Sequence, residues 1–507
     1  MDEGVVTHYA FQERGQDLKL EADYVVVGSG AGGATAAVSL AREGASVLLI
    51  EAGAWRAPEH YPISTFGSMR DLMSDMGSVL TTGRALWPIV QGKAVGGTTV
   101  INSAICVRTP GDIFAQWERE HGIEADPLSD QLWGYQDELE VELGAEDSPV
   151  QTLGRMNELA IEAAAKLGIE SHRTKRYSKG CEGSGLCLSG CRTSRKQSLN
   201  ITFVPEMLRL GGTLLSCAPA SKILTEGNRA VGVQGHFEHP QERRKGAKWV
   251  VRARKAVLLA AGVVRSPVLL QRSKIRGKAV GKNFRSHPGT GIYGYYDDPV
   301  DMHNAATQGW ASSAYRTEPG FKLETLVIPP GMIASRLVAG GKDLTQQLEA
   351  YRHLAMWVMA VRAESVGSVH SMFGMPMVRY TMDKADMHKL RTAAHTLAQM
   401  HVAAGARYII PCIYGMPDTL APSEIDLLLD APLEPRAWFA ALTHLFGGCT
   451  MGSDPSRSVC DPRGRVHGYD GLVIADASQI PTNLGVNPQH TIMALARLRA
   501  HQLLAEG

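Results

Sequence analysis

The stretch that decides the fold is Asp23–Gly53, DYVVVGSGAGGATAAVSLAREGASVLLIEAG. Its valine run is typical of a buried parallel strand, and a helical pattern and a second strand follow, so the stretch predicts a complete βαβ unit. The glycines after the first strand permit a tight turn that brings a pyrophosphate against the helix N-terminus, whose free N–H groups favour anions. Glu51 ends the second strand, where a carboxylate accepts hydrogen bonds from ribose hydroxyls. The stretch therefore predicts a dinucleotide-binding site.

The composition excludes several classes of protein. The chain has 507 residues, with 52 Lys and Arg against 51 Asp and Glu and a formal net charge of +1, so we expect no nucleic-acid partner. No apolar run reaches the roughly 20 residues that cross a bilayer, so we expect no transmembrane segment. The first residues, MDEGVVTHYAFQERGQDLKL, do not resemble a secretory signal. We therefore expect a cytoplasmic protein, or one that is periplasmic or peripheral to a membrane if a leader has been removed.

The middle of the chain is less regular than the start. Residues 154–167 have helical periodicity, and residues 249–261 are typical of a strand. From about 289 to 436 no nucleotide-binding motif occurs, and amphipathic helices are expected at 343–351 and 383–404. We expect this segment to form a separate lobe that covers the substrate.

Four separated blocks of sequence converge on one family. They are Gly28–Gly33 with Glu51, Gly92–Arg108, Lys255–His287 and Thr443–Ala496. In this order they make the chain resemble the glucose-methanol-choline (GMC) oxidoreductases, a family of FAD-dependent alcohol oxidases and dehydrogenases. The resemblance covers the nucleotide-binding parts at both ends of the chain, while the middle lobe matches in position and length. It implies an FAD-dependent oxidoreductase that acts on CH–OH groups.

The resemblance also implies a fold and its division along the chain. The fold class is α/β, with a Rossmann-like FAD-binding domain and a discontinuous α+β substrate-binding domain, an architecture like that of p-hydroxybenzoate hydroxylase. Residues 1–150 would begin the FAD-binding domain, and residues 151–288 would hold a cysteine-containing loop and return to that domain. Residues 289–437 would form the substrate-binding lobe, and residues 438–507 would complete the FAD-binding domain and carry the catalytic residues.

The expected cofactor is FAD, for which the last block supplies a second set of residues. Gly471–Asp476 is typical of a strand that ends in an acid, and a buried carboxylate followed by a helix N-terminus suits a permanently held flavin. Some relatives attach FAD covalently through a histidine where this chain has Ile101, so FAD should be noncovalent here. The glycine pattern and the resemblance together give the expected FAD-binding residues: Gly28, Gly30, Ala31, Gly33, Glu51, Ala52, Gly97, Thr98, Asn102, Ala261, Gly262, Asp476, Ala477, Asn487 and Pro488.

Alcohol oxidation needs a base for the hydroxyl proton and a group that holds the substrate oxygen. The family's catalytic histidine falls on His444, and its partner position, His or Asn in the family, falls on Asn487. The resemblance therefore implies that His444 accepts the proton and that Asn487 holds the substrate oxygen near flavin N5. His490 is a second candidate, and His287 is expected to fix the loop around it.

Cys181, Cys187 and Cys191 form a C-x5-C-x3-C cluster in a glycine-rich stretch. Thiolates on flexible loops hold iron–sulfur clusters, and a dehydrogenase branch of the family holds a [3Fe–4S] cluster with similar spacing. The stretch lacks the proline expected after the last ligand, and it is closer to cysteine-containing loops of long-chain-alcohol and sterol relatives. A disulfide with one free thiol, or a zinc site one ligand short, are the other interpretations.

The middle lobe bears on the substrate. Its methionines, among them Met356, Met359 and Met375, favour an apolar or amphipathic alcohol of the fatty, aromatic or sterol type, although such stripes are more often plain core. Glu324 and Glu364 could be acids buried near the pocket or surface residues. The electron acceptor, whether oxygen, a quinone or a cytochrome, is left open. So are three alternatives: a sugar or polyol dehydrogenase with a [3Fe–4S] relay, a non-oxidising flavoenzyme (lyase, isomerase or decarboxylase), and a flavin-binding protein without turnover.

Overall fold

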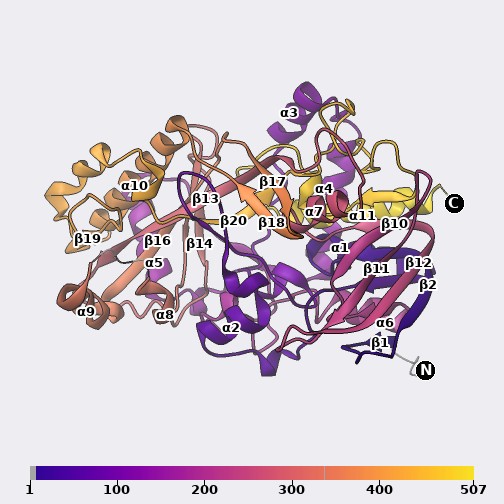
Figure 1. The fold of residues 1–507 in the computed structure, drawn as a ribbon. Coiled ribbons are helices and arrows are strands. Elements are labelled where there is room, and N and C mark those ends of the chain that lie inside the picture. Colours follow the sequence, from indigo (N-terminus) through magenta and orange to yellow (C-terminus); the bar gives the residue numbers. More distant parts are fainter. Residues whose placement is uncertain (1–6, 336, 338, 507) are drawn as a thin grey trace.

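The computed structural model describes residues 7–335, 337 and 339–506, which fold around two large β-sheets (Figure 1). The amino-terminal strands and the last helix lie at one side of the molecule, and residues from the middle of the chain build the other side. Residues 1–6, which belong to the stretch in which no secretory signal is expected, lie outside the described residues.

The first sheet grows outward from the βαβ unit. β2 (Leu18–Val27) and β3 (Val47–Ile50) pair in parallel, and α1 (Ala31–Arg42) joins them. The last four residues of β2 and all of β3 are buried, as expected for strands covered on both faces. The other strands of this sheet are β1 (Thr7–Tyr9), β9 (Thr213–Leu215), β10 (Ala220–Glu226), β11 (Arg229–Glu238), β12 (Lys245–Leu259) and β21 (Leu472–Ile474).

Segments from the start, middle and end of the chain share this sheet. β12 pairs in parallel with β2, its first part pairs with the antiparallel β11, and its last residues pair with β21. On the sheet, α11 (Gln489–Leu504) packs against α1 and α4 (Leu128–Glu142), and α6 (Phe203–Arg209) also packs against α1. The end of the chain therefore returns to the βαβ unit.

The second sheet is built around the long β13 (Lys282–Tyr295), which pairs with β16 (Leu354–Val361) on one side and β20 (Ala441–Phe446) on the other. The sheet is antiparallel except where β20 pairs in parallel with β5 (Pro88–Ile89). Its remaining strands are β4 (Val79–Leu80), β7 (His172–Arg173), β14 (Trp310–Ser312), β15 (Phe321–Thr325), β17 (Gly367–Met372), β18 (Met375–Arg379) and β19 (Tyr408–Ile410). β6 (Ala145–Asp147) and β8 (Lys175–Tyr177) form a separate pair.

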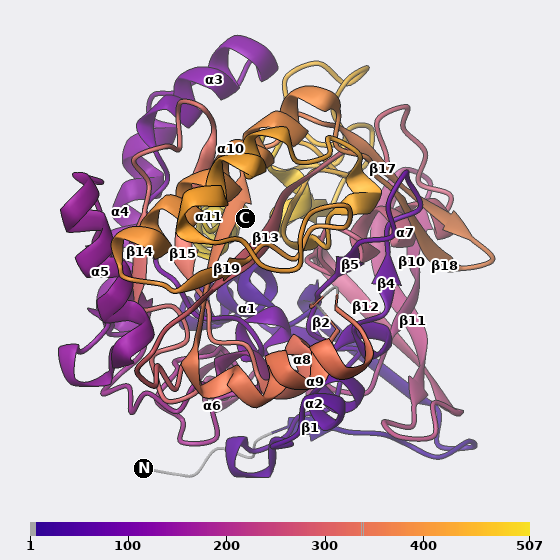
Figure 2. The same cartoon turned by 90° about the vertical axis from the view of Figure 1, so that its left-hand side faces the viewer.

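Helices cover this second sheet (Figure 2). α10 (Lys384–Ala403) packs against β16, β13 and α5 (Gly154–Leu167). Asp383 begins α10 as an N-cap, because its carboxylate accepts a hydrogen bond from the Asp386 N–H. The remaining α-helices are α2 (Thr65–Leu72), α3 (Gly111–His121), α7 (Arg265–Arg272), α8 (Pro330–Ile333) and α9 (Gly341–Glu349).

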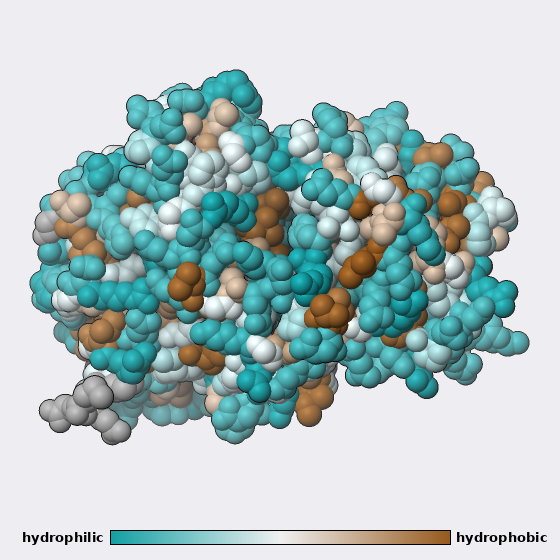
Figure 3. Space-filling model, turned by 180° about the vertical axis from the view of Figure 1, so that it is seen from behind, coloured by the Kyte–Doolittle hydropathy of each residue, from teal (hydrophilic) through white to brown (hydrophobic). Residues whose placement is uncertain are grey.

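The face seen in Figure 3 is mostly hydrophilic, and hydrophobic residues occur on it in small scattered groups. In the part of the chain that the structure describes, no helix combines the length and the apolar character that a membrane span requires.

Most of the expected elements are present. The helices expected at 154–167, 343–351 and 383–404 are confirmed as α5, α9 and α10. The strand expected at 249–261 is confirmed as β12 but begins earlier, because pairing with β11 extends it into the basic stretch. The mixed α/β architecture agrees with the expected fold class, whereas the division of the chain into domains stays a prediction.

Candidate active site

A cavity of about 780 Å³ brings the separated blocks of the sequence together. Residues of the βαβ unit, of the second sheet and of the turn before α11 all line it. Its volume lies within the range of ligand and cofactor sites. The expected site residues that line it are Gly28, Gly30, Ala31, Glu51, Ala52, Gly97, Thr98, Asn102, Ala261, Gly262, His444, Asp476, Ala477, Asn487 and Pro488.

The glycines of the βαβ unit have different tasks. At Gly30 the nearest atom to an added Cβ would be Gly97 Cα at 3.9 Å, so the backbone faces open space that a cofactor can approach. At Gly33, which does not line the cavity, an added Cβ would lie 1.8 Å from the Gly28 carbonyl oxygen. Gly33 therefore serves close packing of α1 on the first turn. Gly28 itself has a φ of 101°, which favours glycine.

Two buried carboxylates line the cavity at the ends of strands. Glu51 accepts hydrogen bonds from the Ser29 N–H at 3.0 Å, the Ser29 hydroxyl at 2.7 Å and the Gly53 N–H at 2.7 Å. Asp476 accepts from the Gly262 N–H at 2.8 Å and the Ser478 N–H at 2.7 Å. Burial raises the pKa of both carboxyls, while these donors oppose that shift. Both carboxylates can therefore accept further bonds from hydroxyls of a dinucleotide.

The glycine-rich block Gly92–Arg108 lies against the turn of the βαβ unit, because the Gly96 N–H donates to the Ser29 hydroxyl at 3.0 Å. Asn102 ties it to α11, because its Nδ2 donates to Gln489 Oε1 at 2.6 Å. Thr98 accepts a hydrogen bond from the Gly92 N–H at 3.0 Å. Ile101, at the position of the covalent attachment in relatives, is buried and lines the cavity. The residues present here fit a flavin dinucleotide and offer no nucleophile at that position.

His444 and Asn487 meet within the cavity. His444 is on β20, Asn487 precedes α11, and Asn487 Nδ2 lies 3.2 Å from His444 Nε2. Burial and, to a smaller extent, the nearby Lys322 ammonium lower the pKa of His444 to about 3, so the ring is neutral near pH 7. A neutral imidazole beside an amide donor can accept a proton from a hydroxyl group.

His287 stands behind His444. It is fully buried, its Nδ1 lies 3.1 Å from His444 Nδ1, and its Nε2 lies 3.0 Å from the Gly485 N–H. It therefore contacts both the expected base and the segment that leads to Asn487. From the sequence, His287 is expected only to fix the local loop.

A buried ion pair adjoins these residues. Lys322 and Glu324 are two residues apart on β15, and Lys322 Nζ lies 2.7 Å from Glu324 Oε1. Lys322 also donates a hydrogen bond to Asn487 Oδ1. Gln308 Nε2 donates to Glu324 Oε2 at 3.1 Å. Glu324 lines the cavity and is only 4% exposed, so of the two interpretations left open for it the buried one is correct. The sequence motifs do not point to Lys322, although the period-two alternation of the strand Phe321–Thr325 puts the Lys322 and Glu324 side chains on one face.

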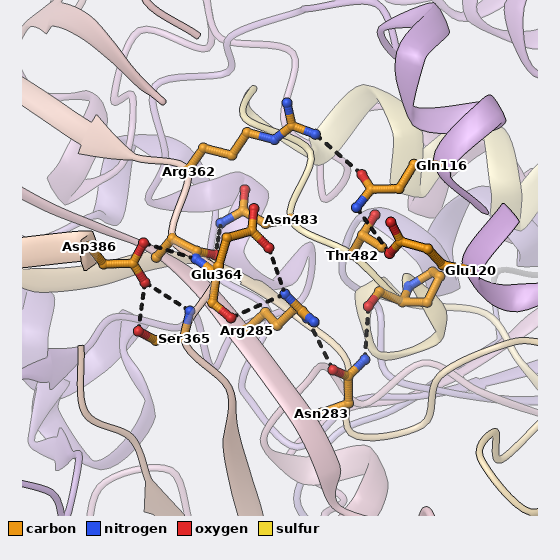
Figure 4. A network of polar contacts seen from close by, with 12 residues as sticks. Gln116, Glu120, Asn283, Arg285, Arg362, Glu364, Ser365, Asp386, Thr482 and Asn483 are labelled. Carbon is orange, nitrogen blue, oxygen red and sulfur yellow. Dashed lines mark hydrogen bonds and ion pairs between the residues drawn. The ribbon is translucent and has the colours of Figure 1, made fainter. Parts of the chain in front are cut away.

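Glu364 is a surface residue, with 58% of its side chain exposed, and its carboxylate pairs with Arg285 at 3.4 Å. Figure 4 shows that this pair belongs to a larger network of polar contacts. In it, Asn283 Nδ2 donates to the Pro481 carbonyl at 2.8 Å, and Asn483 Nδ2 donates to the Ser286 carbonyl at 2.8 Å. The network ties β13 to residues 481–483 and so helps to position Asn487.

Only part of the methionine stripe reaches the cavity. Met359 and Met375 line it together with Leu326, Met332 and Val358. Met356, by contrast, is 1% exposed and belongs to the core.

Buried cations surround the three cysteines of the loop. Arg176 Nη2 lies 3.0 Å from Cys187 Sγ and Nη1 lies 3.8 Å from Cys181 Sγ, while the Lys196 N–H lies 3.4 Å from Cys191 Sγ. Burial raises the pKa of Cys187, but Arg176 and Lys196 outweigh it and bring it below its ordinary value. All three thiols are free, so the disulfide interpretation is wrong. Their described contacts give no support to an iron–sulfur cluster.

His490, the second candidate base, does not line the cavity. Its ring is fully buried and its Nδ1 contacts the Tyr177 hydroxyl. Burial lowers the pKa of His490 to about 3.

Known proteins are similar to this chain over most of its length. An uncharacterized GMC-type oxidoreductase of Mycobacterium tuberculosis is 34% identical over 489 residues, covering 96% of this chain and 76% of that protein. A long-chain-alcohol oxidase of Arabidopsis thaliana is 27% identical, covering 96% and 67%.

Solved structures of GMC enzymes share the fold. Pyridoxine 4-oxidase from Mesorbium loti has a TM-score of 0.70 at 18% identity, covering 95% of this chain and 99% of that one. A formate oxidase variant from Aspergillus oryzae has a TM-score of 0.72 at 18% identity, covering 96% and 99%. The family described as GMC oxidoreductase matches residues 22–289 with its amino-terminal part and residues 363–496 with its carboxy-terminal part. The chain therefore belongs to the GMC oxidoreductases and is an FAD-dependent enzyme of that family.

Proposed function

We propose that the enzyme oxidises an alcohol to an aldehyde or ketone, with His444 as the base and Asn487 as the group that holds the substrate oxygen. The observation that carries this proposal is the 3.2 Å approach of Asn487 Nδ2 to His444 Nε2 at the wall of the cavity. The glycine turn, Glu51 and Asp476 would hold FAD, which would accept the hydride that leaves the carbinol carbon.

The hydrogen bonds around the base support its role. Lys322 donates to Asn487 Oδ1, and this contact turns Asn487 Nδ2 toward His444 Nε2. His444 Nε2 presents the lone pair that a base requires when the proton of the neutral ring is on Nδ1, which lies 3.1 Å from His287 Nδ1. An alcohol hydroxyl between the two side chains donates to His444 and accepts from Asn487. His444 keeps the proton when the carbonyl product leaves.

The apolar side of the cavity supports a fatty, aromatic or sterol-type alcohol as the substrate. Leu326, Met332, Val358 and Met359 line it, and flexible methionines accommodate bulky apolar groups. The 27% identical Arabidopsis relative is named a long-chain-alcohol oxidase. A polyol is the second candidate, because Gln308 and Glu324 place polar atoms at the same wall.

The test is anaerobic flavin reduction by purified holoenzyme with a panel of long-chain, aromatic, sterol and polyol alcohols. We expect the flavin absorbance to bleach with an apolar alcohol and an aldehyde or ketone to form. Bleaching by polyols alone would favour the second candidate. No bleaching by any alcohol, with flavin fully bound, would overturn the proposal in favour of a lyase, an isomerase, a decarboxylase or a protein without turnover.

The roles of the residues and the cofactor's linkage have their own tests. His444→Ala should slow flavin reduction by roughly two to four orders of magnitude while FAD stays bound. His370→Ala, which replaces an exposed histidine of β17, is the matched control and should leave the rate unchanged. Acid precipitation should release free FAD, because Ile101 offers no attachment. Reoxidation with oxygen, a quinone or a cytochrome would then identify the acceptor.

A further inference from the structure

A second cluster of chemically active side chains lies outside the cavity. Among the described residues, Cys106, Glu140 and His490 form a group whose ligand atoms all lie within 4.8 Å of one another. Cys106 lies near the end of the glycine-rich block Gly92–Arg108, Glu140 is on α4, and His490 is in the first turn of α11. A thiol, a carboxylate and an imidazole are the three kinds of side chain that bind zinc.

His490 has a nitrogen that the fold does not use. Within the described part of the chain, no hydrogen-bond partner is found for His490 Nε2, although the ring is fully buried. The nearest carboxylate oxygen, Glu140 Oε1, is 3.6 Å away. That separation is longer than a hydrogen bond between nitrogen and oxygen, which spans about 2.7–3.2 Å. It is close to the roughly 3.3–3.6 Å that separates two ligand atoms of a tetrahedral zinc ion with ordinary bond lengths.

The groups around the cluster hold these ligands in place. The Tyr177 hydroxyl contacts His490 Nδ1, so the proton of the neutral ring can sit there and leave Nε2 with its lone pair. Lys175 Nζ binds Glu140 Oε2 at 2.8 Å and leaves Oε1 directed at the cluster. The Cys106 N–H donates to the Lys175 carbonyl at 2.8 Å, which fixes the thiol beside these residues. Ordered outer contacts of this kind are typical of metal ligands.

We propose that Cys106, Glu140 and His490 bind a divalent transition-metal ion of the zinc type. Binding displaces the thiol proton of Cys106 to solvent, so the metal is held by one thiolate, one carboxylate and one neutral imidazole. Glu140 is partly exposed and provides the route by which the ion enters. Such an ion joins the start of α11, α4 and the glycine-rich block, and it stabilises three elements that flank the flavin site. It has no part in the proposed alcohol oxidation.

The test uses the flavin-loaded full chain after treatment with a chelator. Titration with Zn²⁺ should give one tightly bound ion per chain, by metal analysis and by calorimetry. Co²⁺ should give ligand-field absorption at wavelengths longer than those of the flavin, with the intensity of a tetrahedral thiolate site. Cys106→Ser should weaken Zn²⁺ binding by at least about 100-fold and remove that absorption.

Matched variants separate this site from others. Cys412→Ser changes a cysteine that is 5% exposed, as Cys106 is, but that lies between β19 and β20 of the second sheet, so this variant should bind Zn²⁺ like the wild type. If Cys106→Ser does not fold, Glu140→Gln at the partly exposed ligand should show the same loss. The proposal is overturned if no ion binds, or if binding survives Cys106→Ser and is lost in Cys187→Ser, which would place the metal in the cysteine loop.

Discussion

Lys322 shows how one residue can determine the geometry of the proposed base. It is 4% exposed, pairs with Glu324 and donates to Asn487 Oδ1, from a position 165 residues earlier in the chain. The sequence predicted His444 and Asn487 because both lie in a block that resembles the family. It did not predict Lys322, because its role depends on β15 lying beside the turn before α11, and no local pattern encodes that contact. For His490 the sequence position suggested a catalytic role, but the ring is buried against Tyr177 and does not line the cavity.

Lys322→Met should slow flavin reduction by about 100-fold, because Asn487 loses the contact that orients its amide. It should also lower the free energy of unfolding by about 3–5 kcal/mol, because Glu324 loses its buried partner. The double variant Lys322→Met/Glu324→Gln removes both charges, so it should regain stability without regaining the rate. Stopped-flow reduction and denaturant unfolding of the holoenzyme measure the two effects. A double variant with the wild-type rate would exclude a positioning role for Lys322.

At the scale of elements, the sequence predicted the βαβ unit well because its signals are local. The valine run, the glycine turn and Glu51 specify strand, turn and strand end through residues that are close to one another in the sequence. It predicted the bounds of β2 and β12 less well, because their polar residues become strand only by pairing with each other and with β11. Within the unit, the same residue type serves two purposes. Gly30 faces open space, whereas Gly33 faces the Gly28 carbonyl at a distance that no side chain tolerates.

Gly30→Val should therefore fold and weaken FAD retention by at least about tenfold, because its side chain fills the approach to the helix N-terminus. Gly33→Val should fail at the folding step, since its Cβ would lie 1.8 Å from a carbonyl oxygen. Gly134→Ala on the exposed side of α4, where an added Cβ meets nothing within 4 Å, is the control and should keep its FAD. Flavin content per chain and far-UV circular dichroism distinguish the outcomes. A Gly30→Val protein with stoichiometric FAD would contradict the site.

The whole molecule encloses imidazoles on strands of the second sheet, at His287 and His444, and on helices α10 and α11, at His401 and His490. Burial lowers the pKa of His401, His444 and His490 to about 3 and takes that of His287 well below its ordinary value. The unfolded chain binds protons at these rings near pH 6.5, and the folded chain does not, so folding is favoured above that pH and weakens as the pH falls. Each ring contributes about 1.4 kcal/mol per pH unit below its unfolded pKa. Sequence alone could not predict this sum, because it depends on which histidines tertiary packing buries.

The enzyme should therefore lose thermal stability between pH 7.5 and pH 5.5, a range above the ordinary pKa values of Asp and Glu. His401→Phe tests the cause away from the proposed active site, because His401 stacks on Trp357 with ring centroids 3.8 Å apart, a contact that a phenyl ring can keep. The variant loses the hydrogen bond between Tyr296 and His401 and should be less stable at pH 7.5. Its unfolding midpoint, followed by circular dichroism, should nevertheless fall less steeply with acidity than that of the wild type. An equal fall in both proteins would show that His401 binds its proton in the folded state as readily as in the unfolded one.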